Sequence, residues 1–264
     1  MNPLEVRLAY DRQVRQRLCP DQPGELVERT NLAVRVIGDD GWHAVLWSDL
    51  DAPSADRVVA EQVDRFASLG AAWEWKHYSY DLPPDLPRRL VAAGLTPEPP
   101  ETLMVTELAE LALDPVVPDG VLLVPVIDDK DVAALVRLHD EVFGGDHSAV
   151  GRALAAQLQA DPPTAAAALA VVDGVAVSAG RVEFARGTDF ASIWGGGTLP
   201  EWRGRGLFRA LVAHRAALAS AEGFRYLQVD ATADSRPILA RLGFVELATT
   251  TPFIYPDASA PPSA

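Results

Sequence analysis

The chain has 264 residues, and with 48% hydrophobic residues it holds enough apolar material for one large or two modest domains. Its formal net charge of −14 argues against nucleic acid as a partner. The acidic balance favours a cationic small molecule, or serves only to keep the surface solvated. A single cysteine, Cys19, excludes an intrachain disulfide framework and fits a reducing compartment. Because no signal-peptide core and no apolar run of roughly 20 residues is found, we expect a soluble, cytoplasmic protein with no membrane partner.

The first half is predicted to contain three regular elements before a boundary rich in turn residues at 110–120. In chain order these are an amphipathic helix over 55–69, a strand over 73–80 that ends at Asp81, and a helix over 85–93 followed by Gly94-Leu95. The loop that precedes the first helix, residues 48–56, has three aspartates but neither glycine nor arginine. A loop of this composition would repel phosphate groups.

The second half shows a longer alternation of strands and helices. In chain order we predict a strand over 121–127, helices over 131–143 and 150–159, strands over 166–172 and 175–184 joined by the hairpin signal Asp173-Gly174, a strand over 190–194 that runs into Gly195-Gly196-Gly197, a helix over 207–221, a strand over 226–229 that ends at Asp230, a helix over 235–242 closed by Gly243, and a last strand near 252–255.

A glycine-rich turn opens directly into the helix that begins at Leu207. Its sequence is Pro200-Glu201-Trp202-Arg203-Gly204-Arg205-Gly206. Free backbone N–H groups and the positive end of the helix dipole make a strand, glycine-rich loop and helix an anion site. From Trp202 to Ala221 there is no acidic residue, and four arginines stand at positions 203, 205, 209 and 215. We interpret this as a basic pocket for a polyanionic ligand; the alternative is a surface turn in a chain that prefers arginine to lysine throughout.

Two motifs together resemble the GNAT superfamily of acyl-CoA-dependent N-acetyltransferases. The family loop, Arg/Gln-x-x-Gly-x-Gly/Ala, is matched by Arg203-x-x-Gly206-x-Phe208, and a later helix ending in Leu-Gly-Phe is matched by Leu242-Gly243-Phe244. The resemblance covers roughly residues 121–255. Phe208 stands where the family has a small residue; this change leaves the backbone amides in place but alters the pocket beside them.

The resemblance implies acetyl-CoA as co-substrate and no metal. It places the cofactor on Gly196, Gly197, Thr198, Leu199, Arg203, Gly204, Arg205, Gly206, Leu207, Phe208, Arg209 and Thr232. In this family the strand before the loop splays from its neighbour and the pantetheine arm lies in the gap. The three successive glycines suit such an approach, or else mark a simple strand break.

Transfer of an acetyl group to an amine requires a base, an oxyanion donor and a leaving thiolate. A backbone N–H near Gly197 or Thr198 is the expected oxyanion donor. Glu183 and Asp189 are the first choices for the base, and His147 comes third; Glu183 is also explained as an outward-facing strand residue and His147 as part of a loop. Many family members place a tyrosine acid at the position of Leu239, so the hydroxyl near the sulfur would come from Thr232 or Ser235, although Ser235 also suits a helix cap.

The two halves are predicted to be related by an internal repeat with a constant offset, or to be similar by coincidence. The offset aligns Asp81 with Asp230, Asp85 with Asp234, Leu90 with Leu239, and Gly94 with Gly243. The predicted fold is a mixed α/β sheet in two tandem GNAT-like domains, with the cofactor site in the second. The predicted boundaries are a degenerate domain at 1–110, a linker at 111–120, a catalytic domain at 121–255 and a disordered tail at 256–264.

The predicted function is transfer of an acetyl group from acetyl-CoA to a primary amine by direct attack in a ternary complex. The acceptor is a small, possibly cationic amine of unidentified structure, and the protein is a monomer or homodimer. One rival is a non-catalytic acyl-CoA sensor or regulatory module. A second rival, a nucleotide-phosphate-binding protein, lacks the Lys-Ser/Thr pair that follows a P-loop, because Leu207-Phe208 stands there.

Overall fold

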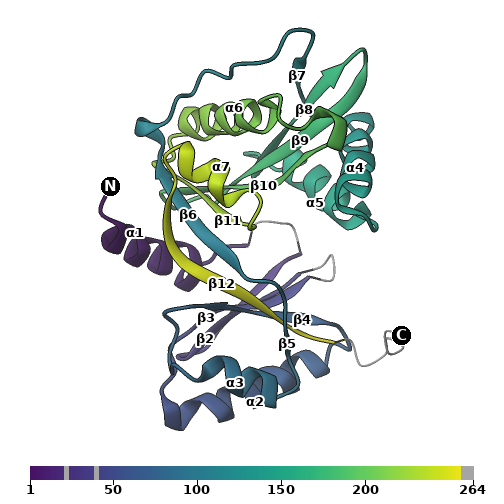
Figure 1. Ribbon diagram of the computed structural model, residues 1–264. Coiled ribbons are helices and arrows are strands. Elements are labelled where there is room, and N and C mark those ends of the chain that lie inside the picture. The colour runs from purple at the N-terminus through teal and green to yellow at the C-terminus, as the bar shows by residue number, and fades with distance from the viewer. Residues whose placement is uncertain (21–23, 39–41, 257–264) are drawn as a thin grey trace. The chain divides into compact units, whose positions relative to one another are not determined.

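The computed structural model describes residues 1–20, 24–38 and 42–256 (Figure 1). The chain divides into two compact units that are not consecutive in sequence. Unit 1 comprises Met1, 105–229 and 237–245, whereas unit 2 comprises 2–104, 230–236 and the chain from Glu246 onward. Each unit combines strands and helices, so the mixed α/β class predicted from the sequence is confirmed.

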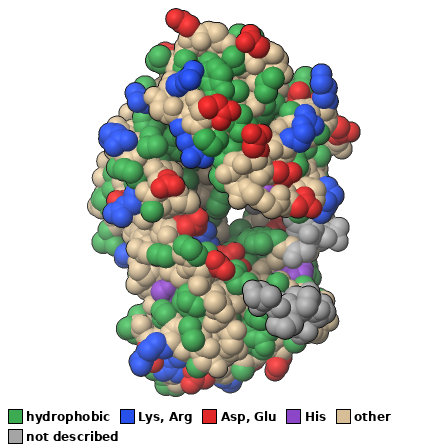
Figure 2. All heavy atoms as spheres, turned by 45° about the vertical axis from the view of Figure 1, so that its right-hand side comes forward, with side chains coloured by type: hydrophobic (Ala, Val, Ile, Leu, Met, Phe, Trp, Pro, Cys, Tyr) green, Lys and Arg blue, Asp and Glu red, His purple; other side chains and the backbone are tan. Residues whose placement is uncertain are grey.

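On the side drawn in Figure 2, the negative charge is not gathered in one patch. Acidic and basic side chains are interspersed there with apolar ones. In the described part of the chain, every helix is too short or too polar to cross a bilayer. Among the same residues, no three His, Cys, Asp or Glu side chains come together in a group that would hold a metal ion.

Unit 2 is built around the strand order β1-β2-β3-β4-β12, with the short β5 also paired to β12. Its elements are α1 (Pro3–Tyr10), the π-helical turn η1 (Asp11–Gln16), β1 (Leu26–Arg29), β2 (Ala33–Ile37), β3 (His43–Ser48), α2 (Ala52–Ala67), β4 (Trp73–Tyr78), α3 (Leu86–Ala92) and β5 (Thr96–Pro97). The pairs β1/β2, β2/β3 and β4/β12 are antiparallel, and β3/β4 is parallel. Trp73 and Trp75 alternate along β4 and enter a core that the apolar stripe of α2 completes, and α2 and α3 lie beside each other on the strands (Figure 1).

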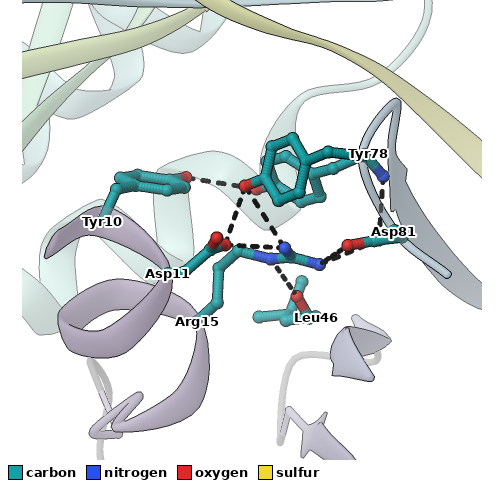
Figure 3. Close-up of polar contacts among 7 residues, drawn as sticks. Tyr10, Asp11, Arg15, Leu46, Tyr78 and Asp81 are labelled. Carbon is teal, nitrogen blue, oxygen red and sulfur yellow. Dashed lines mark hydrogen bonds and ion pairs between the residues drawn. The ribbon is translucent and has the colours of Figure 1, made fainter. Parts of the chain in front are cut away.

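A polar network inside unit 2 joins η1 to β4 and the turn after it (Figure 3). The guanidinium of Arg15 donates two hydrogen bonds to the carboxylate of Asp81, both 3.0 Å long, and one of 2.7 Å to Asp11. It also lies 3.8 Å from the centre of the Tyr78 ring, whose hydroxyl is hydrogen-bonded to that of Tyr10. Since Arg15 is only 3% exposed, these partners replace the water it loses on folding.

Unit 1 carries the strand order β11-β10-β9-β8-β7. Its elements are η2 (Leu108–Glu110), β7 (Leu122–Pro125), α4 (Asp129–Phe143), α5 (Ser148–Gln159), β8 (Ala165–Val172), β9 (Val175–Phe184), β10 (Phe190–Thr198), η3 (Pro200–Trp202), α6 (Leu207–Ala221) and most of α7 (Arg236–Arg241). Strands β7 to β10 pair antiparallel, whereas β10 and β11 are parallel. Asp173 and Gly174 both have positive φ, 49° and 80°, as a two-residue hairpin turn requires.

Three strands pass from one unit to the other along the chain: β6 (Glu101–Glu107), β11 (Tyr226–Ala231) and β12 (Val245–Tyr255). Strand β12, which the sequence groups with the second half, pairs with β4 of the first half from Thr250↔Tyr78 to Tyr255↔Trp73. Residues 111–120 contain no helix or strand. The sequence-based boundaries stay a prediction, and residues 257–264 of the expected tail lie outside the described residues.

The predicted repeat has a counterpart in local geometry. Gly94 and Gly243 follow α3 and α7 with φ of 99° and 97°. At the same offset, the amide after each glycine bonds the carbonyl of a fully buried leucine: Leu95 to Leu90 and Phe244 to Leu239, both at 3.1 Å. Both helices therefore end in the same left-handed glycine cap, which supports the predicted repeat.

Candidate functional site: a splayed strand and an uncapped helix

The loop before α6 leaves a series of backbone amides without partners. Gly204 and Gly206 have φ of 73° and 90°, and Gly206 is the N-cap of α6. No side chain caps this helix, and its first hydrogen bond across the cap runs from the amide of Ala210 to the carbonyl of Gly206. Within the described part of the chain, no hydrogen bond is formed by the amides of residues 204–209. A 15-residue helix with unpartnered N–H groups at its start suits an anion.

The corresponding helix of unit 2 is closed to an anion. Its N-cap, Asp51, accepts a 2.9 Å bond from the amide of Ser54, and the Ser54 hydroxyl lies 3.0 Å from the amide of Asp51. This capping box places a carboxylate on the helix start, where a phosphate would have to lie. The aspartate-rich loop therefore has a local structural role that fits the absence of a cofactor loop in the first half.

Three of the four arginines near the loop are exposed, and one is not. Arg203 donates through Nε to the carbonyl of Thr198 at 3.0 Å, and the guanidinium of Arg205 lies 4.5 Å from the centre of the Trp202 ring. Arg209 is exposed on the first turn of α6. Arg215 is only 1% exposed, so it does not contribute to a surface pocket as its place in the basic stretch suggested.

Strand β10 separates from β11 before it reaches the loop. The two strands pair from Phe190↔Tyr226 to Ser192↔Gln228, and no pair follows in the described residues, although β10 continues to Thr198. On its other side β10 stays paired with β9, with a register shift between Trp194 and Gly197. The strand therefore has the splayed form that the family resemblance implies.

Four carbonyl groups of this splayed segment are bonded by side chains. The donors and acceptors are Arg215 Nη1 to Trp194 O at 3.2 Å, His139 Nε2 to Gly195 O at 3.0 Å, Ser178 Oγ to Gly197 O at 2.7 Å, and Arg203 Nε to Thr198 O at 3.0 Å. They come from α6, α4, β9 and the loop respectively. Side chains thus take the place of a regular backbone ladder where the strand is irregular.

The three glycines of β10 are needed because side chains lie against them on both faces. A Cβ atom on Gly195 would lie 2.7 Å from Cε1 of His139, and one on Gly197 would lie 3.0 Å from Cζ of Phe143. On the opposite face, a Cβ atom on Gly196 would lie 2.8 Å from the ring of Phe208. Helices α4 and α6 therefore cover opposite faces of β10, and the glycine run is neither a simple strand break nor only an approach for a ligand.

Arg215 is a buried cation beneath this segment. Its Nη1 reaches the carbonyls of Arg181 and Trp194, and its Nε bonds the carbonyl of Leu211, but its Nη2 has no hydrogen-bond partner among the described residues. Burial, together with the nearby charge of Arg181, lowers the pKa of Arg215 to about 9. A Cβ atom on Gly180 would lie 2.7 Å from the guanidinium carbon, so this glycine makes room for it.

Two histidines and an aspartate meet at the end of α4 that lies against β10. His147 contacts Asp140 twice, through its amide at 2.8 Å and its Nδ1 at 3.0 Å, both to Oδ1. The rings of His139 and His147 are 5.7 Å apart, and both pack against Phe143. Burial lowers the pKa of His139 to about 4, although its bond to the Gly195 carbonyl acts in the opposite direction. His139 is therefore neutral near pH 7.

The predicted acid–base residues are not brought together. Glu183 accepts a 2.9 Å bond from Nε of Arg181 and lies opposite Ser192, where β10 is still paired on both sides. Asp189 precedes β10, and its carbonyl accepts the amides of Arg225 and Tyr226 at the far end of that strand from the loop.

Ser235 and Thr232 belong to the segment 230–236 of unit 2. The Thr232 hydroxyl accepts the Ser235 amide at 3.4 Å, and the two hydroxyls are 3.3 Å apart. The side chain that accepts an amide in this turn is therefore that of Thr232, whereas the Ser235 hydroxyl donates to the Thr232 carbonyl at 3.3 Å. Their roles toward the cofactor and in catalysis stay predictions.

Among the residues predicted to bind the cofactor, two have side chains in the core of unit 1, Leu199 at 6% and Leu207 at 1% exposure. Only their backbone groups are open to a ligand. The hydroxyl of Thr198 is 2.7 Å from that of Ser178. Phe208 lies over Gly196, which gives the departure from the small family residue a packing role.

Sequence reasoning missed His139, Asp140, Ser178 and the burial of Arg215. Arg215 follows Leu211 by four residues and so falls on the buried stripe of α6. His139 likewise follows Leu135 by four residues on α4. A basic or imidazole side chain on an apolar stripe was the available signal in both cases.

The sequence and the fold agree with one protein family. Residues 132–244 match the family model described as the Acetyltransferase (GNAT) family. This region is a GNAT acetyltransferase domain. No curated protein shows a significant match to the chain.

Among solved structures, a GCN5-related N-acetyltransferase from Kribbella flavida is similar with a TM-score of 0.71 at 20% identity, covering 95% of each chain. A tandem GNAT protein from the clavulanic acid biosynthesis pathway gives 0.61 at 15% identity, covering 91% of this chain and 86% of its own. A GCN5-related N-acetyltransferase from Sphaerobacter thermophilus gives 0.61 at 15%, covering 96% and 93%. At these identities the likeness concerns the fold, which is that of two tandem GNAT-like units.

Proposed function

We propose that the protein transfers the acetyl group of acetyl-CoA to a primary amine, with the donor bound by the second half of the sequence. The observation that carries this proposal is the uncapped start of α6 beside a splayed β10. Six consecutive residues, 204–209, have amides free for phosphate oxygens, and Arg203, Arg205 and Arg209 supply positive charge around them. In a GNAT domain these features bind the pyrophosphate, and the gap beside β10 takes the pantetheine arm.

Acetyl transfer from a thioester to an amine does not require a covalent enzyme nucleophile. The only cysteine of the chain, Cys19, belongs to unit 2, so we assign direct attack of the amine on the thioester in a ternary complex. Backbone N–H groups of Gly197 or Thr198 are the proposed donors to the oxyanion. Because Asp51 caps α2, we assign the cofactor to the second half of the sequence and regard the first half as a degenerate copy. The acceptor is proposed to be a small amine, with its cationic character resting on the net charge of −14.

Calorimetric titration with acetyl-CoA, followed by thiol release across a panel of amines, tests this function. We expect binding with turnover on at least one amine. Arg205→Gln and Arg209→Gln should each weaken acetyl-CoA binding by roughly tenfold, because each removes a charge-assisted contact to phosphate. Arg88→Gln, an arginine with an 84% exposed side chain in unit 2, is the matched control and should bind as the wild type does. Absence of binding by the wild-type protein would refute the proposal.

A non-catalytic acyl-CoA sensor is favoured by one observation. Leu239, at the position where many family members have a tyrosine acid, is fully buried in the protein core. No hydroxyl is therefore supplied from this position. Binding of acetyl-CoA without acceleration of acetyl transfer to any amine would select the sensor, whereas turnover excludes it. Equal competition by ATP and CoA would instead point to a nucleotide-phosphate-binding protein.

A further inference from the structure

We propose that His147, oriented by Asp140, is the general base that removes a proton from the ammonium group of the acceptor. This inference rests on the proposed acetyltransferase function. It assigns the base to a residue of unit 1 other than Glu183 or Asp189.

The contact with Asp140 fixes the tautomer of His147. The carboxylate oxygen Oδ1 accepts a bond from the His147 amide at 2.8 Å, so the loop holds the ring against it. Since a carboxylate accepts, the 3.0 Å contact from Nδ1 places the proton on Nδ1 and leaves the lone pair on Nε2. No described residue hydrogen-bonds Nε2. An imidazole with an Asp partner and a free nitrogen is suited to accept a proton and to be stabilised once it is charged.

His147 is separated from the splayed segment of β10 by only one aromatic ring. Its ring centre is 5.9 Å from that of Phe143, and Phe143 is the side chain that lies against Gly197. It is also 5.7 Å from the ring of His139, which bonds the carbonyl of Gly195. In the proposal the acceptor amine approaches an acetyl group beside Gly195 to Gly197 from the α4 side, where His139 and Phe143 lie between these glycines and His147.

His139 acts as a positioning residue in this arrangement. Its bond to the Gly195 carbonyl, which can only accept, places its proton on Nε2. Because His139 is buried and neutral, it adds no positive charge that would oppose protonation of His147. The side chain of His147 is 24% exposed, so the proton it takes can pass to solvent.

Glu183 is less suited to this task. Its carboxylate accepts a 2.9 Å hydrogen bond from Nε of Arg181 and is therefore already occupied by a cation, whereas no described residue hydrogen-bonds Nε2 of His147. Asp189 lies six residues before Gly195, which is roughly 20 Å along an extended strand. Of the three bases considered from the sequence, His147 alone combines a free nitrogen with proximity to the glycine segment.

The acceptor ammonium gives one proton to Nε2 of His147 and becomes a neutral amine. The amine nitrogen forms a bond to the thioester carbon, the oxyanion collapses, and the carbon–sulfur bond breaks with its electron pair on sulfur. The second amine proton passes to the thiolate, so the products are an amide and CoA thiol, and His147 releases its proton to solvent.

The test compares His147→Gln and Asp140→Asn with the wild type on two kinds of acceptor. With a strongly basic amine, which is charged near pH 7, we expect kcat/KM to fall by about 100-fold or more in His147→Gln. With hydroxylamine, which is largely neutral at this pH, the fall should be below about fivefold, because no proton has to be removed first. Asp140→Asn should show the same acceptor dependence, and the double variant should lose no more than His147→Gln, because the pair acts as a unit.

Calorimetric titration with acetyl-CoA should give unchanged affinity in both variants, which shows that the fold and the donor site are intact. His214→Gln, a partly buried histidine on α6, is the matched control and should keep wild-type activity on both acceptors. An equal loss on basic and neutral acceptors, or no loss at all, would overturn the assignment of His147 while leaving the acetyltransferase function standing. A wild-type protein that binds acetyl-CoA but transfers to no acceptor would refute the function itself.

Discussion

The Nε2 atom of His139 lies 3.0 Å from the carbonyl oxygen of Gly195, at the point where β10 has left β11. Gly195 has a φ of 59°, so its backbone turns in a way that L-residues rarely adopt. The carbonyl that this turn removes from the regular ladder is taken by an imidazole of α4. One contact therefore couples the helix that carries Asp140, the partner of the proposed base, to the strand that would hold the acetyl group.

Gly195→Ala should destabilise the protein by more than the left-handed backbone conformation of residue 195 alone would cost. A Cβ atom at this position meets His139 at 2.7 Å, whereas Gly187, with a φ of 80°, has no atom within 4 Å of the corresponding position. Both alanine variants incur about 1–2 kcal/mol from a left-handed backbone. We expect Gly195→Ala to lose about 1–3 kcal/mol beyond Gly187→Ala because of the steric overlap. Urea denaturation of the two variants measures the difference, and equal losses would contradict the crowding at β10.

Stability should fall with decreasing pH because two buried histidines are held neutral. Burial lowers the pKa of both His139 and His77 to about 4; the charge of Arg15 adds to the effect at His77. An unfolded histidine has a pKa of about 6.5, so between pH 6.5 and 4 the unfolded state binds protons that the native state does not. The stability is therefore fully present above pH 6.5, and each histidine contributes a loss of up to about 3 kcal/mol as pH falls toward 4.

The dependence is measured by urea denaturation at pH 7, 6 and 5 for the wild type, His139→Gln and His77→Gln. Each variant lacks one of the two titrating groups, and so we expect a shallower fall of unfolding free energy with decreasing pH. A slope equal to that of the wild type in both variants would show that neither imidazole is responsible.

Much of the element order could be predicted from sequence, because the hydrophobic period of a helix or strand and the turn residues that end it act locally. The helix at 207–221 agrees with α6 at both ends, since Gly206 and Gly223 enclose an uninterrupted apolar stripe. The glycine cap after α7 and the Asp173-Gly174 hairpin also follow from local backbone preference. By contrast, β12 pairs with β4 across more than 170 residues, and no local pattern encodes such a partner.

The candidate site was predictable where it depends on backbone and unpredictable where it depends on packing. The free amides at 204–209 follow from glycines at known spacing. The crowding of Gly195 by His139 and the burial of Arg215 depend on where α4 and α6 cross β10. The contact of His147 with Asp140, seven residues earlier in the chain, depends on the path of the loop between α4 and α5, which no local sequence pattern encodes.

Arg215→Met should affect function more than stability. The substitution removes a buried cation that has no acidic partner among the described residues, which offsets the loss of its bonds to the carbonyls of Trp194 and Arg181. We expect a stability change within about 1 kcal/mol. The KM for acetyl-CoA should rise by roughly tenfold, because Trp194 O loses the donor that holds the bulged strand.

Arg215→Ala serves as the comparison, because it removes the same charge but leaves a cavity. It should cost about 2–5 kcal/mol in unfolding free energy. If Arg215→Met were equally destabilising, the hydrogen bonds of the guanidinium would have to contribute more free energy than its desolvation costs. Thermal and urea denaturation, with steady-state kinetics on the same samples, distinguish the two cases.

Arg15→Met should destabilise unit 2 strongly, because it leaves the Asp81 carboxylate buried with the Tyr78 amide as its remaining donor among the described residues (Figure 3). Loss of one partner from a buried pair costs about 3–5 kcal/mol. Arg57→Met, which breaks an ion pair with Glu61 between side chains more than half exposed, is the matched control and should cost at most about 1 kcal/mol.

The double variant Arg15→Met/Asp81→Asn separates the desolvation of the carboxylate from the loss of packing. The neutral amide oxygen of asparagine still accepts the Tyr78 amide, but it carries no charge that needs the guanidinium. We therefore expect the double variant to be more stable than Arg15→Met alone by about 1–2 kcal/mol. Urea denaturation followed by tryptophan fluorescence reports on unit 2 through Trp73 and Trp75. If the second substitution adds a further loss, the stability derives from the packing of Arg15 on Tyr78 and not from its neutralisation of Asp81.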